Sequence, residues 1–246
     1  MTELRTVPSE QGIPLAFRHT PGSGPAVVFL PGYMSDMAGS KATAIFEHCR
    51  TQGRECLLLD YSGCGESDGD FADGTLGIWR DEVLLLIANQ VESERVVITG
   101  SSMGGWLMLL VALELGDQLA SLVGIASAPD FSEWGFDEEQ KAQLRAGETI
   151  FEDSDYGYDP MPTHAKFWHD AERRKLLDAP IPVTCPVRLL HGQEDKDVPP
   201  EISLRLAAAL ASEDVQVTLV KGGDHRLSRD SDVALLLRTV DATRSI

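Results

Sequence analysis

Short apolar segments alternate with helix-like segments along most of this chain, and this alternation constrains the fold more than any other feature. Strands that are apolar on both sides are typical of a parallel sheet that helices cover on both faces. We therefore expect an α/β fold with a mostly parallel central sheet. The expected strands are residues 3–7, 13–18, 26–30, 55–60, 96–99, 120–126, 187–191 and 215–220, and the expected helices are residues 41–52, 75–89, 106–115, 201–212 and 230–244.

The length of 246 residues suits one α/β domain, and we expect residues 1–246 to form it. Residues 127–183 interrupt the alternation and are expected to form a small helical lid or cap. Its aromatic side chains could line a substrate pocket, or they could pack a helical flap onto the domain. The insert combines many acids with aromatics: Asp130, Glu133, Asp137, Glu138, Glu139, Glu148, Glu152, Asp153, Asp155, Asp159, Phe131, Trp134, Phe136, Phe151, Tyr156, Tyr158, Phe167 and Trp168.

The charge balance argues against two classes of partner. The chain has 39 acidic and 21 basic residues, which gives a formal net charge of -18. Phosphate backbones and anionic lipid surfaces need clustered lysine and arginine, so we expect no nucleic acid partner. The start of the chain has no basic region followed by an apolar stretch, and the longest apolar run, residues 106–113, is too short to span a bilayer. We therefore expect a cytoplasmic protein with no membrane span.

The four cysteines show neither a zinc pattern nor a disulfide framework. No two of them form a C-x-x-C pair, and no histidine lies nearby at ligand spacing. We expect packed, reduced thiols and no bound metal. The cysteines are Cys49, Cys56, Cys64 and Cys185.

A Gly-x-Ser-x-Gly sequence follows the strand expected at residues 96–99 and precedes a helix-like run. The sequence Gly100-Ser101-Ser102-Met103-Gly104 has the form of a nucleophile elbow, in which strand and helix pack too closely for side chains two residues either side of the serine. Chance alone would produce such a motif in roughly one comparable chain in ten, and the strand and helix on either side distinguish this one. The pattern predicts Ser102 as a nucleophile.

A serine nucleophile needs a base, and the base needs an acid that orients it. His225 alone among the six histidines follows the last expected strand, in a glycine-rich turn, and we predict it as the base. The strand at 187–191 leads into a loop rich in carboxylates, where we predict Asp195 as the acid. Three further aspartates remain open for this role: Asp197, Asp224 and Asp130.

Acyl transfer also needs two N–H donors for the oxyanion. One usually follows the nucleophile, and the other lies in the loop after the first buried strand. These positions are Met103 and Tyr33, where the neighbouring Gly32 lets the backbone approach a substrate. The alternative for Tyr33 is a plain turn with a packed tyrosine.

Taken together, these motifs resemble the α/β-hydrolase family over essentially the whole chain. The turn at 60–69 is similar to the family's glycine-rich turn after a buried strand, and His191-Gly192-x-x-Asp195-x-x-Val198-Pro199 is similar to its acid-bearing loop. The usual His-Gly of the oxyanion loop is Pro31-Gly32 here, which departs from the wider family.

Finer features resemble a subgroup of mitochondrial palmitoyl-protein thioesterases that also act as acyl-glucuronide esterases, together with their bacterial relatives. These features are the residues at 30–33, 60–63, 75–80, 100–109, 181–186 and 224–226. The resemblance implies hydrolysis of acyl thioesters or esters without a metal or organic cofactor, on a small or acylated substrate. A C–C bond hydrolase, a peptidase, or a non-catalytic binding protein on a hydrolase scaffold are the alternatives. We expect no organelle presequence and therefore do not carry over the subgroup's location, and the oligomeric state is left open.

Overall fold

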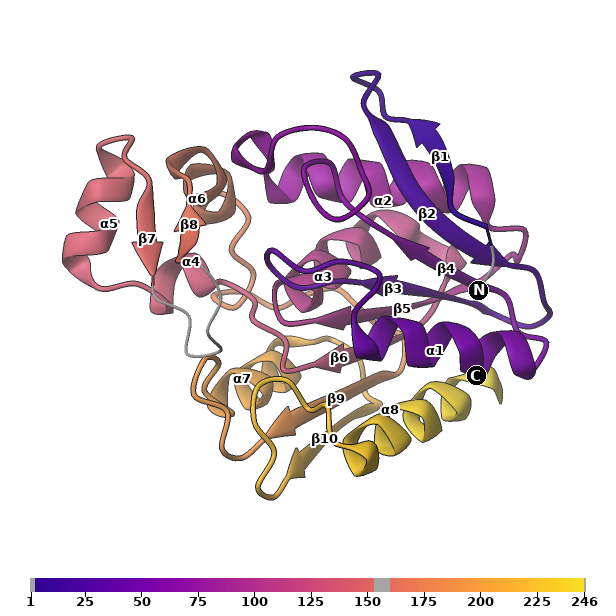
Figure 1. Ribbon diagram of the computed structural model, residues 1–246. Helices are drawn as coiled ribbons and strands as arrows, with labels where there is room; N and C mark the ends of the chain where they lie inside the picture. Colours follow the sequence, from indigo (N-terminus) through magenta and orange to yellow (C-terminus); the bar gives the residue numbers. More distant parts are fainter. Residues whose placement is uncertain (1–2, 153–159, 246) are drawn as a thin grey trace.

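A computed structural model describes residues 3–152 and 160–245, and its centre is an eight-stranded sheet (Figure 1). The strands lie in the order β1-β2-β4-β3-β5-β6-β9-β10. The first strand is antiparallel to β2, and β2 is antiparallel to β4, while the remaining neighbours are parallel. The strands are β1 (Arg5–Pro8), β2 (Pro14–Thr20), β3 (Ala26–Leu30), β4 (Cys56–Leu59), β5 (Val96–Ser101), β6 (Leu119–Ile125), β9 (Val187–Gly192) and β10 (Val215–Val220).

Helices cover both faces of this sheet because alternate side chains of its strands point to opposite sides. Val28 and Leu30 of β3 join one core cluster, while Val27 and Phe29 join another. The first cluster contains side chains of α2, α3 and α7, and the second contains those of α1 and α8. These helices are α1 (Ser40–Thr51), α2 (Leu76–Gln90), α3 (Met103–Leu115), α7 (Glu201–Ala209) and α8 (Asp230–Ala242).

The order of the strands reverses near the middle of the sheet. Strand β3 lies between β4 and β5, so the chain leaves it toward one edge and then returns to its other side. Loops at such a switch point diverge, and ligands of open α/β sheets bind between them at the carboxyl ends of the strands. The loops after β3, β5, β9 and β10 all leave that same end.

The segment between β6 and β9 holds small elements that stand at one end of the sheet (Figure 1). The three helices agree with the helical expectation, but the antiparallel pair of strands is an addition to it. Strands of three residues are too short for an alternating pattern to stand out in a sequence. The elements are α4 (Phe131–Trp134), α5 (Glu138–Arg145), β7 (Ile150–Glu152), β8 (Met161–Thr163) and α6 (Ala165–Glu172).

The expected sheet and its flanking helices are confirmed, with shifts at several ends. Helix α3 begins at Met103, three residues before the start expected from its apolar run, because the elbow glycines form its first turn. Helix α7 ends at Ala209 instead of continuing to residue 212, since Leu210 turns to extended backbone and pairs with Ile181. Short 3-10 helices occur at η1 (Phe71–Asp73), η2 (Gly116–Gln118) and η3 (Thr243–Ser245).

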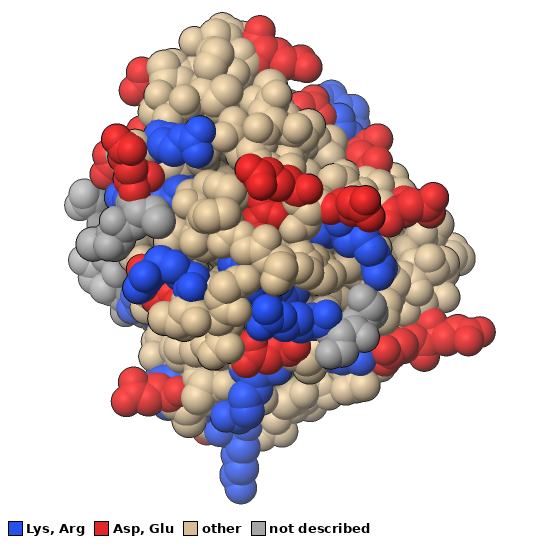
Figure 2. All heavy atoms as spheres, turned by 90° about the vertical axis from the view of Figure 1, so that its right-hand side faces the viewer, with Lys and Arg blue, Asp and Glu red and all other residues tan. Residues whose placement is uncertain are grey.

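Charged side chains of both signs lie at the surface, and most of the thiols lie inside. Acidic and basic side chains are interspersed on the face that Figure 2 shows. All four cysteines are free, and three of them are buried. Within residues 3–152 and 160–245, no helix combines the length and the apolar character needed to cross a bilayer.

Candidate active site

Ser102 sits in a strained turn between β5 and α3. Its backbone has φ 54° and ψ -122°, a region that non-glycine residues rarely adopt, at a cost of about 1–3 kcal/mol. Three backbone hydrogen bonds hold the turn: Ser102 donates to Ile125 O at 2.9 Å, and its own carbonyl accepts from Gly105 at 2.8 Å and from Ala128 at 3.0 Å. The surrounding backbone therefore fixes the turn from which the Ser102 side chain extends.

The two glycines of the motif are required by close packing. A Cβ atom at Gly100 would lie 2.2 Å from the carbonyl oxygen of Gly104, and a Cβ at Gly104 would lie 2.2 Å from that of Leu30. Both obstacles are backbone atoms, which cannot rotate away as a side chain can. The crowding at Gly100 is the strand-to-helix packing that the sequence predicted, whereas Gly104 is crowded by Leu30 and Pro31 at the end of β3.

His225 and Asp195 lie in line with the Ser102 hydroxyl. The Nε2 atom of His225 is 3.1 Å from Ser102 Oγ, and its Nδ1 is 2.9 Å from Oδ2 of Asp195. The second oxygen of Asp195 accepts from the backbone amides of Asp197 at 3.0 Å and Val198 at 2.9 Å. The structure thus brings together the three residues that the sequence predicted, from loops after three different strands.

The Asp195 side chain is fully buried, yet its surroundings favour the charged form. Burial opposes ionisation, but contacts with His191 and His225 and the amide of Val198 outweigh it and hold the pKa of the Asp195 carboxyl well below its ordinary value. An ionised acid next to Nδ1 requires the proton of His225 to sit on that nitrogen. Its Nε2 is then the atom that can take a proton from Ser102.

The acid loop and the histidine loop are joined through their backbones, a contact that the sequence did not predict. A Cβ at Gly192 would lie 2.3 Å from Gly223 O, so only glycine lets the two loops touch there. The backbone amide of Gln193 donates to Val220 O at 3.0 Å, and that of Glu194 donates to Gly223 O at 2.8 Å. The signal in the sequence was the glycine after each of the last two strands.

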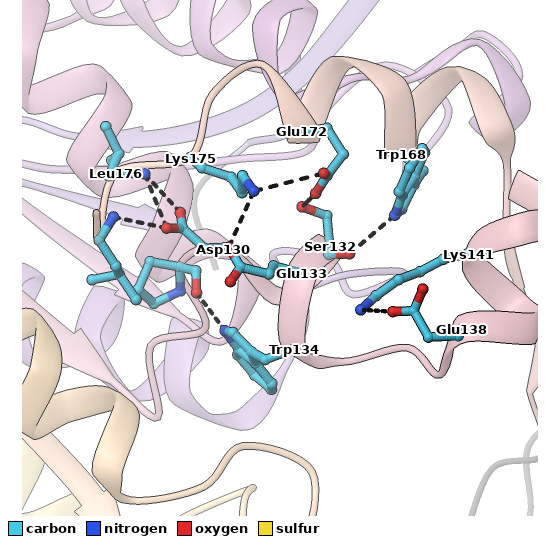
Figure 3. A network of polar contacts seen from close by, with 12 residues as sticks. Asp130, Ser132, Glu133, Trp134, Glu138, Lys141, Trp168, Glu172, Lys175 and Leu176 are labelled. Carbon is cyan, nitrogen blue, oxygen red and sulfur yellow. Dashed lines mark hydrogen bonds and ion pairs between the residues drawn. The ribbon is translucent and has the colours of Figure 1, made fainter. Parts of the chain in front are cut away.

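Asp130, which was also a candidate for the acid, is engaged elsewhere. It is buried directly before α4, and its carboxylate accepts from the amides of Leu176 at 2.9 Å and Leu177 at 2.7 Å (Figure 3). Asp224 accepts from the amide of Leu227 at 3.0 Å. Asp197 remains close to the triad, with a carboxylate oxygen within 4.8 Å of the ligand atoms of Asp195 and His225.

The loop after β3 passes directly over Ser102. A Cβ at Gly32 would lie 3.3 Å from the Cβ of Ser102, and Tyr33 follows in a turn closed by Ser35 N to Gly32 O at 3.1 Å. Met103 is the first residue of α3, where amides have no partner within the helix. The two expected oxyanion donors therefore belong to the two backbone segments that meet at the serine.

Two buried residues after β4 fix this loop, and their sequence pattern alone did not indicate that role. The Tyr61 hydroxyl donates to Pro31 O at 3.0 Å, and Asp60 accepts from the amides of Met37 at 2.7 Å and Glu66 at 2.9 Å. Burial raises the pKa of Asp60 to about 6, although the two amides favour its charged form.

Tyr33 links the same loop to the insert. Its hydroxyl donates to Pro162 O in β8 at 2.9 Å, and its ring stands edge-on to Phe71 and Phe167, each 5.0 Å away between centroids. A half-open cavity of about 210 Å³ lies beside this loop. Its lining residues are Met34, Ser35, Asp36, Gly63, Cys64, Gly65 and Phe71.

The insert's described aromatics pack partly onto the domain and partly against one another, and Phe131 stands edge-on to Trp106 of α3 at 5.7 Å between ring centroids. Phe131 stacks on Phe167 at 5.8 Å, while Phe136 and Trp168 form a small core of their own with Leu144 and Ile150. Phe151 differs, because 67% of it is exposed. Several residues of the expected lid lie outside the described residues: Asp153, Asp155, Tyr156, Tyr158 and Asp159.

Polar contacts reinforce this packing within the insert (Figure 3). Lys175 lies 3.1 Å from Glu133 and 3.7 Å from Glu172, and Ser132 donates to Glu172 at 2.7 Å. The indole of Trp168 donates to Ser132 O at 3.0 Å. These contacts tie α4 to α6, so the two helices form one body.

Comparison with known proteins gives matches over most of the chain. Residues 83–241 match the family described as the prolyl oligopeptidase family. The chain is 40% identical over 235 residues to a mouse protein named "Palmitoyl-protein thioesterase ABHD10, mitochondrial", covering 92% of this chain and 77% of that protein. The human protein of the same name is 39% identical over 231 residues, covering 92% and 75% of the two chains.

Solved structures agree with these sequence matches. The alpha/beta hydrolase domain-containing protein 10 from mouse superposes with a TM-score of 0.89 and 38% identity, covering 98% of each chain. A putative hydrolase from Agrobacterium vitis S4 superposes with a TM-score of 0.93 and 32% identity, covering 99% of each chain. The chain belongs to the α/β-hydrolase superfamily and, within it, to the family described by the prolyl oligopeptidase model.

Proposed function

We propose that this protein is a serine hydrolase that cleaves acyl thioesters or esters through Ser102, His225 and Asp195. The observation that carries the proposal is the continuous line of contacts from Asp195 Oδ2 through His225 to Ser102 Oγ, with distances of 2.9 and 3.1 Å. Relatives at about 40% identity are named thioesterases, which supports the same reaction class here.

In the proposed mechanism, His225 takes the proton of Ser102 as the serine oxygen attacks the acyl carbon. Asp195 holds the imidazole and stabilises its positive charge. The amides of Met103 and Tyr33 donate to the oxyanion, and the dipole of α3 adds to this stabilisation at its amino-terminal end. The thiol or alcohol then leaves with the proton from His225, and water releases the acyl group by the reverse steps. The proposed steps need no metal or organic cofactor.

Two kinds of function are alternatives to thioester or ester hydrolysis. A peptidase or a C–C bond hydrolase would use the same triad, and the matching family model carries a peptidase name. A binding protein on a hydrolase scaffold would need none of these contacts. Ester turnover that depends on Ser102 excludes the binding protein, and comparison of ester, thioester, amide and diketone substrates separates the enzymes.

Burst kinetics test the covalent step. With a p-nitrophenyl ester, we expect release of about one nitrophenolate per protein before the slower steady rate, because acylation precedes hydrolysis. Ser102→Ala is expected to abolish the burst and reduce kcat by about 10⁴-fold or more. Equal turnover by wild type and Ser102→Ala would refute the proposal.

The shape of the pocket decides which acyl groups and leaving groups the protein accepts, so a panel of substrates of graded size is needed. We propose p-nitrophenyl esters and acyl thioesters of increasing chain length. A cavity of about 210 Å³ beside the oxyanion loop offers one place for an acyl chain.

We also propose a cytoplasmic location and no nucleic acid partner. The curated relatives are named mitochondrial, so cell fractionation is the test of location.

A further inference from the structure

His191 is a buried histidine beside the triad for which the mechanism above has no use. It lies on β9, is 0% exposed, and precedes the glycine that joins the acid and histidine loops. Its Nε2 is 2.9 Å from Val198 O and 3.2 Å from Oδ2 of Asp195. Its Nδ1 is 2.7 Å from the hydroxyl of Ser203 on α7.

These neighbours assign the tautomer of the His191 ring. Both groups at Nε2 are oxygen acceptors, so that nitrogen must carry the proton. Nδ1 then accepts from the Ser203 hydroxyl, which is itself 1% exposed. The ring is thus held on both sides, and its Nε2–H faces the carbonyl of Val198 and the carboxylate of Asp195 together.

One oxygen of Asp195 therefore faces two imidazoles. Oδ2 is 2.9 Å from Nδ1 of His225 and 3.2 Å from Nε2 of His191, while Oδ1 accepts the amides of Asp197 and Val198. Because the carboxylate is shut off from water, these four donors fix both its rotation and the share of its charge that His225 meets.

We propose that His191 is a positioning residue for Asp195, which holds Oδ2 in line with His225 and withdraws part of its negative charge from that histidine. This inference rests on the proposed function. Ser203 and Val198 act through His191 by fixing its ring. Without His191, the acid loop would lose the contact between its Val198 carbonyl and β9, and Asp195 would have one donor fewer.

Three variants test the proposal. His191→Phe keeps a ring of similar size without its nitrogens, His191→Gln keeps an N–H donor, and Ser203→Ala removes the hydroxyl that holds the ring. For His191→Phe we expect kcat to fall about tenfold, with KM within about twofold of wild type, because only the triad geometry changes. His191→Gln should recover most of the lost activity.

The pH dependence of kcat/KM distinguishes a positioning role of His191 from a role in packing alone. A carboxylate with one donor fewer binds the imidazolium of His225 more strongly, so the acid limb of kcat/KM should move to higher pH in His191→Phe. A smaller shift in the same direction is expected in Ser203→Ala. Further ionisable groups nearby, namely Asp197, Glu194, Asp224, Lys41, Arg226 and Arg229, are unchanged in all three variants.

The outcomes decide between this inference and the function on which it rests. A folded His191→Phe with wild-type kcat and acid limb overturns the role of His191, as does a His191→Gln that is as slow as His191→Phe. If His191→Phe does not fold, an unchanged acid limb in Ser203→Ala overturns it. Failure of the proposed function is seen separately, as activity that survives Ser102→Ala.

Discussion

The strained backbone of Ser102 depends on neighbours that leave no space for side chains. Gly104 lies against the carbonyl oxygens of Leu30 and Pro31, which belong to the strand and loop that pass over the nucleophile. A methyl group there must push the oxyanion loop away from the serine or unwind the first turn of α3. A single added carbon at this position therefore acts on both catalysis and stability.

For Gly104→Ala we expect the free energy of unfolding to fall by about 3 kcal/mol or more, and esterase activity to be lost. Urea denaturation and a p-nitrophenyl ester assay measure the two effects. The matched control is Gly39→Ala, because the nearest atom to a Cβ at Gly39 is Asp36 O at 3.4 Å. Equal effects of the two substitutions would show that the crowding at Gly104 is unimportant.

The loop after β3 and the β7–β8 hairpin of the insert are joined through the side chain of Tyr33. Its hydroxyl donates to Pro162 O, and its ring packs against Phe71 and Phe167. The Tyr33 amide that we propose as an oxyanion donor therefore lies on a loop that contacts the insert.

For Tyr33→Phe we expect kcat to fall several-fold with little change in KM, since the ring contacts remain and only the bond to Pro162 is lost. Steady-state kinetics with one ester measure this. Tyr61→Phe is the control on the fixed side of the loop, where the carbonyl of Pro31 would lose its donor. An unchanged kcat in Tyr33→Phe would mean that the insert does not position the loop.

Asp60 joins β4 to the oxyanion loop and should make stability depend on pH. Burial raises its pKa from 3.8 to about 6 in the folded protein. Between these values the folded protein keeps a proton that the unfolded chain has released. The contribution of Asp60 to the free energy of unfolding therefore falls as pH rises from about 4 to 6, by up to about 3 kcal/mol, and is constant above this range.

Asp60→Asn removes this titration. We expect the free energy of unfolding of wild type, minus that of the variant, to fall between about pH 4 and pH 6. Urea denaturation at a series of pH values gives both curves, and the difference cancels the remaining titrating groups that the two proteins share. Parallel curves would contradict a raised pKa for Asp60.

The elements and the proximity of the three proposed catalytic residues could be predicted because their signals are local in the sequence. Each apolar strand is a short continuous run, and Ser102, Asp195 and His225 each follow such a run in a glycine turn, in the order that the fold requires. The missed features join distant segments: Tyr33 to Pro162, Gly192 to Gly223, and His191 to Asp195. Such contacts depend on how the loops pack, and the hydrophobic periodicity of the sequence carries no information about that packing.

A buried arginine joins two distant segments of the chain at the end of the sheet away from the insert. Arg54 is 1% exposed and donates to Pro25 O at 2.9 Å, Val240 O at 2.8 Å and Thr243 Oγ1 at 3.1 Å. It thereby ties the turn before β3 to the carboxyl end of α8, where a positive charge also complements the helix dipole.

For Arg54→Met we expect a loss of about 2–4 kcal/mol in the free energy of unfolding, because buried carbonyls lose their donor. Arg50→Met is the control: Arg50 is exposed and pairs with Glu47, so its removal should change stability by about 0.5 kcal/mol or less. Urea denaturation of both variants checks this, and a similar loss from each would contradict the role assigned to Arg54.

Both the proposed reaction and the role of His191 require that the fold activates Ser102 as a nucleophile. Labelling of the whole protein by a fluorophosphonate probe, followed by mass spectrometry of its peptides, reports this activation without a choice of substrate. We predict one equivalent of probe on Ser102, with labelling lost in Ser102→Ala and strongly slowed in His225→Ala. A wild-type protein that stays unlabelled, or that carries the probe on another residue, would contradict an activated Ser102.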